Sequence, residues 1–274
     1  MVDPRLADLL PLLPPVAHPG RQWVPVPAGE SGAAVWRRDD GGAFAKCVTA
    51  ADVDALRGER DRVQWLAGTG VPGPAVLDWS ASPRGACLVT TAVPGVAASE
   101  LPSRALLAAW PSMVRVLRRL HALPVAHCPF ERRLSSMFRL AEDVVGRGAV
   151  NPDFLTSQQR GVPPTTLLET LRAERAQRQA QEEADLVVCH GDACLPNFLV
   201  DPDTLECTGL IDLGRLGVAD RHADLALLRA NARQRWDGDD EARAEQILAE
   251  AYGADRIDAA RLRFYLHLDP LTWS

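Results

Sequence analysis

Residues 187–214 constrain this chain more than any other stretch, because polar side chains interrupt two apolar, β-like runs there. A Val-Val-Cys run leads into His-Gly-Asp192, and Asn197 follows with four residues between them. A Pro-Asp turn at 202–203 separates this loop from the second apolar run, 207–211, and Asp212 directly follows that run. Because Asp192 and Asn197 lie on one short loop, both side chains can point into the same space. The stretch therefore predicts two strand ends that carry a carboxylate, an amide and a second carboxylate.

Protein kinases place the same residue types in the same order: H-R-D, four residues, N, and then D-F-G. In that arrangement the first aspartate accepts the proton of the attacking hydroxyl, while the asparagine and the second aspartate hold magnesium ions. Here a glycine and a leucine stand in place of the arginine and the phenylalanine. Single Asp and Asn residues at strand ends are usually turn formers. The ordered pair of motifs favours phosphoryl transfer, with Asp192 as base and Asn197 and Asp212 as magnesium ligands.

The first third of the chain alternates in the manner of an antiparallel sheet with one helix. Five runs are predicted as strands and one apolar face as a helix: 22–26, 34–37, 43–48, 75–79 and 86–91, with the helix over 52–67. Between the first two strands, a Gly-x-Ser31-Gly segment can lie over phosphates, with Ser31 donating where the kinase pattern has a glycine. Such a glycine pair alone is more often a plain turn.

Lys46 and Glu59 are predicted to form an ion pair. Lys46 sits between apolar neighbours in the middle of a strand, and Glu59 falls on the apolar face of the helix 52–67. An unpaired carboxylate on that face is costly, and a lysine–glutamate pair positions the α- and β-phosphates in kinases. The alternatives are an edge-strand lysine that faces water and a glutamate at the margin of the apolar face.

The β pattern breaks at the segment 90–95, where Val-Pro-Gly follows two threonines. We place a domain boundary there, with residues 1–93 as the nucleotide-binding lobe and 94–274 as the catalytic and substrate-binding lobe. The backbone of this segment can meet a purine edge, although its composition also fits a simple linker. Beyond it the pattern is mostly helical, at 103–121, 166–183, 225–232, 241–252 and 258–268, with a loop-rich region at 126–165 that could shape a substrate lid.

Several polar residues outside these motifs have open roles. Asp224 follows the second motif and is expected to accept backbone N–H groups of the catalytic loop, which is structural support. His121 is expected to be a capping or core residue. Arg215 can touch phosphate or pair with an aspartate, since arginine does both well. Asp269, near the end of the sequence, can face a cleft.

Composition and charge limit the classes of partner. A net charge of −6 argues against nucleic acid and mildly favours a cationic ligand. No apolar run approaches the roughly 20 residues that span a bilayer, and the first residues do not resemble a signal peptide. We therefore expect a cytoplasmic protein with no membrane partner. None of the six cysteines forms a C-x-x-C pair, so zinc is not expected.

Taken together, the residues resemble the aminoglycoside phosphotransferase family, and within it the streptomycin 3″-phosphotransferases. The two catalytic motifs, Lys46, Glu59 and the phrase Leu-His-Ala-Leu-Pro at 120–124 carry the family resemblance. The narrower likeness rests on three phrases: Ala-Val-Asn-Pro-Asp-Phe-Leu at 149–155, Thr-Gly-Leu-Ile-Asp-Leu-Gly-Arg-Leu-Gly at 208–217, and Phe-Tyr-Leu-x-Leu-Asp-Pro-Leu-Thr-Trp at 264–273.

This resemblance implies an α+β, two-lobed, protein-kinase-like fold, with an N-terminal antiparallel β-sheet plus one helix and a mostly helical C-terminal lobe. It implies transfer of the γ-phosphoryl group of ATP, with GTP as an alternative donor, to the 3″-hydroxyl of streptomycin with Mg²⁺, which confers antibiotic resistance. By position, Asp192 is the catalytic base, and Lys46 holds the phosphates with Glu59 behind it. The backbone of Thr91 and Val93 meets the nucleotide base.

The resemblance defines the drug contacts less well. Asp269 matches an acidic substrate position of kanamycin-type relatives, but the loop 155–161 lacks the acids that those relatives carry before the catalytic motif. Two alternatives therefore remain. One is a kinase of this fold acting on another aminoglycoside or a small hydroxylated metabolite. The other is a non-catalytic nucleotide- or drug-binding protein, against which the presence of Lys46, Asp192, Asn197 and Asp212 speaks, because a binding module needs no base.

Overall fold

The computed structural model describes residues 9–15, 21–26 and 33–273, and its contacts divide the chain into two compact units. Unit 1 comprises Met1–Gly95 and Thr208–Gly214, and unit 2 comprises Val96–Cys207 and Arg215–Ser274. The predicted phosphate-loop residue Ser31 lies outside the described residues. The segment with Asp212 thus belongs to the same unit as the N-terminal strands. The assignment of residues 1–93 to nucleotide binding and of residues 94–274 to catalysis and substrate binding stays a prediction.

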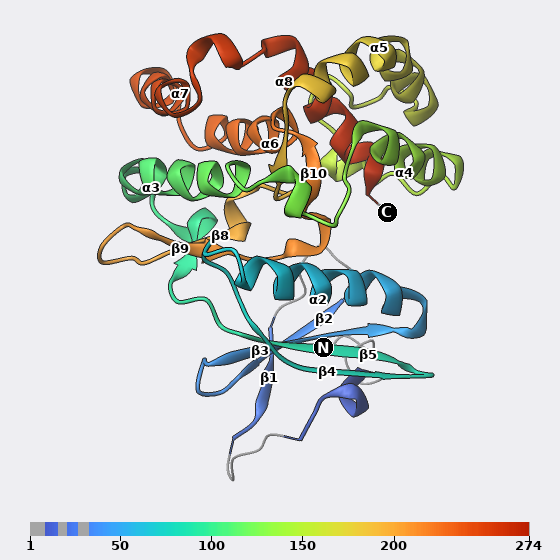
Figure 1. Cartoon of the computed structure of the whole chain (residues 1–274), viewed down its shortest axis with the longest axis vertical. Helices are drawn as coiled ribbons and strands as arrows, with labels where there is room; N and C mark the ends of the chain where they lie inside the picture. The colour runs from blue at the N-terminus through green and yellow to red at the C-terminus, as the bar shows by residue number, and fades with distance from the viewer. Residues whose placement is uncertain (1–8, 16–20, 27–32, 274) are drawn as a thin grey trace. The chain divides into compact units, whose positions relative to one another are not determined.

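Unit 1 is built on a five-stranded antiparallel sheet in the order β1-β2-β3-β5-β4 (Figure 1). Its strands are β1 (Trp23–Pro25), β2 (Ala34–Arg38), β3 (Ala43–Thr49), β4 (Val76–Ser82) and β5 (Gly85–Thr91). An Asp-Asp-Gly-Gly turn joins β2 to β3, with Gly41 at φ 72°. All five strands predicted from the sequence are present.

The two faces of this sheet have separate cores. Alternation along β3 sends Ala45 and Cys47 to one face, where they pack with Trp36. The opposite face carries Val48 and packs against helix α2 (Val53–Ala67). Since side chains alternate along a strand, Lys46 points to the face that α2 covers. The helix predicted over 52–67 is confirmed.

Unit 2 is mostly helical and contains several short antiparallel strands (Figure 1). Its helices are α3 (Ser103–His121), α4 (Leu134–Gly146), α5 (Pro164–Ala184), α6 (His222–Arg233), α7 (Gly238–Tyr252) and α8 (Ala259–Leu268). Strand β7 (Leu186–Cys189) pairs with β10 (Gly217–Asp220), and β6 (Val96–Ala97) pairs with β8 (Phe198–Val200). Strand β9 (Cys207–Leu210) begins in unit 2 and continues into unit 1.

The prediction of a loop-rich region over 126–165 is wrong across α4. This helix buries Leu134, Met137, Phe138 and Ala141, which follow the i, i+3, i+4, i+7 spacing of an apolar helix face. Proline and glycine residues crowd the sequence on both sides of the helix and hide this short periodic run. Helix α4 covers only part of 126–165, so a substrate lid formed by this region stays a prediction.

The remaining predictions about the fold agree with the structure. An antiparallel sheet with one helix near the N-terminus and a mostly helical remainder confirm the α+β class. Among the helices in the described part of the chain, none has the length and apolar character needed to cross a bilayer. The six cysteines are free thiols.

Candidate active site

In unit 1, Lys46 and Glu59 form the predicted ion pair. Lys46 Nζ lies 2.8 Å from Glu59 Oε2. The two side chains retain only 22% and 13% of their exposure, respectively. Strand β3 presents the lysine to α2, and the glutamate lies one turn after the buried Leu56 on that helix. The lysine therefore does not face open water, and the glutamate is not a marginal residue of the helix.

Asp212 joins the same cluster. Its Oδ1 lies 3.2 Å from Lys46 Nζ, while 44% of its side chain remains exposed. The backbone at Asp212 has φ 57°, a left-handed conformation that aspartate tolerates better than most residues. This turn follows β9, where the amide of Leu210 bonds to the carbonyl of Pro72 at 3.0 Å. The geometry leaves a half-exposed carboxylate next to a charged lysine.

The charges of this cluster favour two kinds of ligand. Burial alone would lower the pKa of Lys46, but the carboxylates of Glu59 and Asp212 outweigh it and raise the pKa. The ammonium therefore stays charged and can bind a phosphate oxygen. Burial raises the pKa of Glu59 despite the charge of Lys46, so the half-exposed Asp212 is the carboxylate of this cluster that suits a cation.

In unit 2, the loop that carries Asp192 and Asn197 begins where β7 ends, and we call it the catalytic loop. Gly191 fixes the path of its backbone. Gly191 has φ 83°, and a Cβ there would lie 2.2 Å from the backbone oxygen of Arg215. Neither the conformation nor the space admits a side chain. This contact explains why glycine replaces the arginine of the kinase-type motif.

Asp192 and Asn197 are held together on this loop. Asn197 Nδ2 donates to the backbone oxygen of Asp192 at 2.9 Å and to its Oδ2 at 3.0 Å. Both residues are 8% exposed. The bonds fix the carboxylate and use the amide nitrogen of Asn197, so the amide oxygen is the atom suited to a cation. The sequence prediction that one loop aims both side chains into one space is confirmed.

The surroundings of Asp192 strengthen it as a proton acceptor. Burial raises its pKa, the charge of Asp269 adds to that effect, and Arg215 opposes it. A carboxylate with a raised pKa takes a proton more readily than an ordinary aspartate. This property suits a residue that receives a hydroxyl proton.

Asp269 and Arg215, both predicted as substrate residues, contact each other. Asp269 Oδ1 accepts from Arg215 Nη1 at 3.3 Å and from Arg132 Nη2 at 3.4 Å, while its Oδ2 accepts from Trp273 Nε1 at 3.0 Å. The Arg215 guanidinium lies 3.1 Å from the centroid of the Trp273 ring. Of the two roles left open for Arg215, pairing with an aspartate is observed. Drug contact by Asp269 and phosphate contact by Arg215 stay predictions.

Sequence reasoning missed Arg132 altogether. The residue is 6% exposed, and its Cδ would lie 2.7 Å from a Cβ at Gly191. It therefore runs across the catalytic loop toward Asp269. No local pattern signals this contact, because Arg132 and Asp269 are 137 positions apart.

The proposed contacts to the nucleotide base lie at the end of β5. The amide of Thr91 donates to the backbone oxygen of Ala75 at 2.9 Å, and its hydroxyl accepts from the amide of Ala75 at 2.9 Å. Val93 is partly buried just beyond the strand. These bonds fix the backbone of the segment, while base binding by Thr91 and Val93 stays a prediction.

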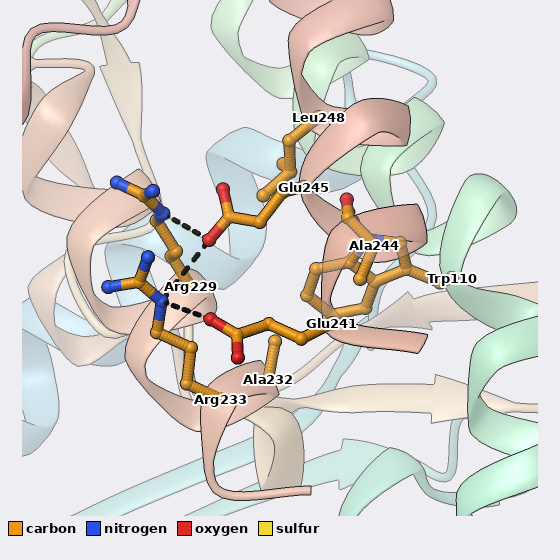
Figure 2. A pocket seen from close by; sticks show the side chains of 8 residues that line it. All are labelled: Trp110, Arg229, Ala232, Arg233, Glu241, Ala244, Glu245 and Leu248. Carbon is orange, nitrogen blue, oxygen red and sulfur yellow. Dashed lines mark hydrogen bonds and ion pairs between the residues drawn. The ribbon is translucent and has the colours of Figure 1, made fainter. Parts of the chain in front are cut away.

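Two other features of unit 2 are not candidate sites for chemistry. Ligand atoms of His121, Cys189 and Asp224 lie within 4.8 Å of one another, but hydrogen bonds already engage all three. A shallow hollow lies among α3, α6 and α7 (Figure 2). Ion pairs between arginines of α6 and glutamates of α7 border it, and no predicted site residue lines it.

Comparison with known proteins identifies the family. The sequence profile described as the phosphotransferase enzyme family matches residues 22–265. The chain belongs to this family. It is 58% identical over 255 residues to a streptomycin 3″-kinase of Streptomyces griseus, with 93% of each chain covered. It is 42% identical to an aminoglycoside 3′-phosphotransferase of Streptomyces fradiae, covering 92% of this chain and 96% of the relative.

Solved structures agree with this assignment. An aminoglycoside phosphotransferase from Streptomyces rimosus, in complex with ADP and streptomycin, superposes with a TM-score of 0.86 at 53% identity. The match covers 92% of this chain and 93% of that chain. The resemblance to aminoglycoside phosphotransferases and the kinase-like α+β fold expected from the sequence are confirmed.

Proposed function

We propose that this phosphotransferase moves the γ-phosphoryl group of ATP to the 3″-hydroxyl of streptomycin and so protects its host from the drug. The observation that carries this proposal is the likeness to the streptomycin 3″-kinase of Streptomyces griseus, which extends over nearly the whole of both chains. The related structure that binds ADP and streptomycin supports the same two ligands. The reaction consumes ATP, so we place the protein in the cytoplasm, where ATP is made.

Each unit supplies part of the chemistry. In unit 1, Lys46 would bind oxygens of the α- and β-phosphates, with Glu59 holding the ammonium in place. The backbone at Thr91 and Val93 would bind the base. In unit 2, Asp192 would orient the attacking hydroxyl. Ser31 is the proposed additional donor to phosphate.

Asn197 and Asp212 are the proposed magnesium ligands. One offers an amide oxygen and the other a half-exposed carboxylate. Oxygen donors of this kind fit Mg²⁺. When bound, the ion neutralises charge on the phosphates during transfer. GTP would satisfy the same phosphate contacts, so only the base-binding segment can discriminate between the two nucleotides.

The reaction forms a bond between the 3″-oxygen and the γ-phosphorus and breaks the bond from that phosphorus to the bridging oxygen of ADP. Asp192 receives the hydroxyl proton and later loses it to solvent. Because the transition state of phosphoryl transfer is loose, most of the rate comes from positioning and charge stabilisation. The bonds from Asn197 to Asp192 serve this positioning.

The test is a phosphorylation assay with ATP and Mg²⁺, in which mass spectrometry detects a phosphorylated drug. Streptomycin and kanamycin are offered separately to the wild type and to Asp192→Asn. We expect the wild type to phosphorylate streptomycin and Asp192→Asn not to do so. A parallel assay replaces ATP with GTP to test the second donor. Transfer to kanamycin but not to streptomycin would support the proposed phosphotransferase activity and contradict the proposed substrate. Binding of both ATP and streptomycin without any product would favour a non-catalytic protein.

A further inference from the structure

A chain of hydrogen bonds runs from the last residue of α7 to the catalytic loop. Tyr252 Oη lies 3.2 Å from His121 Nδ1, and His121 Nε2 lies 3.0 Å from Asp224 Oδ2. Asp224 in turn accepts from the amides of His190 at 2.7 Å and Gly191 at 2.8 Å. Asp192 is the next residue. The expectation that Asp224 supports the loop is confirmed, and two further residues stand behind it.

In this series of hydrogen bonds, each group has a defined role as donor or acceptor. A carboxylate only accepts hydrogen bonds, so the proton on His121 must sit on Nε2, which donates to Asp224. In the neutral ring, Nδ1 then accepts from Tyr252. Burial raises the pKa of the Tyr252 hydroxyl, which therefore keeps the proton that it donates. Each bond thus fixes the orientation of the next group.

The side chains that make these hydrogen bonds are shielded from water. Asp224 is fully buried, and His121 and Tyr252 are 8% and 7% exposed. The rings of His121 and Tyr252 also meet edge to face, with centroids 5.6 Å apart. Buried hydrogen bonds of this kind are strong determinants of geometry, because water cannot replace a lost partner.

The first half of helix α7 contacts both α6 and α3. Arg233 of α6 pairs with Glu241 at 3.0 Å and with Glu245 at 3.3 Å (Figure 2). On the other side, the indole of Trp110 in α3 donates to the carbonyl of Ala244 at 3.1 Å. The last residue of α7, Tyr252, therefore approaches His121 from a fixed helix.

We propose that Tyr252 and His121 are positioning residues for phosphoryl transfer, which orient the Asp224 carboxylate and through it the loop that carries Asp192. Neither residue touches the reacting atoms. The proposal goes beyond the proposed function by assigning a catalytic contribution to the end of α7. It rests on that function for its kinetic test but not for its structural test.

The structural test measures amide hydrogen exchange of the peptide that contains His190 and Gly191. In Tyr252→Phe, which removes only the hydroxyl, we expect exchange of these amides to accelerate about threefold to tenfold, as loss of one hydrogen bond implies. Tyr265→Phe is the matched control, because it also removes a buried tyrosine hydroxyl, and that hydroxyl lies near Asp220 rather than in the hydrogen-bond chain that leads to Asp224. Unchanged exchange in Tyr252→Phe, or equal acceleration in both variants, would overturn the proposal.

A second pair of variants tests His121. Glutamine can place an N–H donor near the position of Nε2, whereas leucine cannot. We expect His121→Gln to retain most of the protection of the loop amides and His121→Leu to lose it. Equal protection in the two variants, with both folded by circular dichroism, would contradict a role for the bond to Asp224.

The kinetic test compares kcat with KM in the same variants. A displaced loop lowers kcat of Tyr252→Phe about threefold to tenfold, while KM for ATP and for streptomycin stays within twofold. A variant that merely lost stability would keep its kcat below its melting temperature, and that result would refute the positioning role. If the wild type does not phosphorylate streptomycin at all, the proposed function fails, and hydrogen exchange alone decides the positioning role.

Discussion

Replacing Glu59 by glutamine isolates the charge that holds Lys46 in place. The substitution preserves shape and removes the partner at 2.8 Å, while Asp212 remains at 3.2 Å from the ammonium. Breaking a buried pair usually costs about 3–5 kcal/mol, because one charge is left alone. Here Lys46 keeps a second carboxylate, so we expect stability to fall by only about 1–2 kcal/mol.

The larger consequence of Glu59→Gln concerns ligand binding. Without Glu59, Lys46 pairs more closely with Asp212 and competes with Mg²⁺ for it. A penalty of about 1–2 kcal/mol on nucleotide binding corresponds to a roughly 5- to 30-fold higher Kd. The magnesium concentration at half-maximal activity should rise in parallel.

Calorimetric titration of the nucleotide, with Mg²⁺ varied, measures this effect. Glu142→Gln is the control, because Glu142 pairs with Arg172 while both side chains are 40% exposed. An exposed pair contributes about 0–1 kcal/mol, so this variant should leave stability and binding nearly unchanged. If Glu59→Gln lowers the melting temperature but leaves Kd and the magnesium requirement within twofold of the wild type, the reasoning is refuted.

Three further predictions follow from the catalytic loop. Asp192→Asn should lower kcat at least ~10²-fold while nucleotide Kd stays constant; residual activity above about one hundredth would contradict its role. Gly191→Ala should cost more than about 3 kcal/mol in chemical denaturation, since its Cβ would lie 2.2 Å from the Arg215 oxygen. Gly148→Ala, with φ 65° and open space, should cost only about 1 kcal/mol. Burial acts to raise the pKa of Asp224, but hydrogen bonds from a histidine and the loop amides lower it overall. The contribution of Asp224 to the free energy of unfolding is therefore complete above about pH 4, and it is lost as the pH falls through the folded pKa. A urea midpoint that rises on acidification below about pH 4 would contradict this.

Local patterns were sufficient to predict the parts of the site that lie within one element or between neighbours. Lys46 occupies an alternating strand and Glu59 an apolar helix face, so the periodicity of each element already orients the two side chains toward one core. Asp192 and Asn197 share a short loop, and a loop of that length leaves few ways to separate them. These relations depend on residues close in sequence, which is why they could be predicted.

Contacts between distant segments could not be predicted in the same way. Arg132 reaches Asp269 across 137 positions, and Tyr252 reaches His121 across 131. Such pairs depend on how helices pack, and no periodicity in either segment encodes the partner. The missed helix α4 has another cause, because prolines and glycines at its flanks obscured a regular apolar spacing.

The membership of Thr208–Gly214 in unit 1 has a consequence for biosynthesis. Unit 1 begins at the N-terminus, yet its last segment leaves the ribosome only after Gly95 has been followed by most of unit 2. At ordinary elongation rates this delay is roughly 6 to 23 s. Throughout that interval the carbonyl of Pro72 has not met the amide of Leu210, and Lys46 has not met Asp212. The strands of unit 1 that precede unit 2 are thus completed late, and the nascent sheet must remain soluble without its final segment.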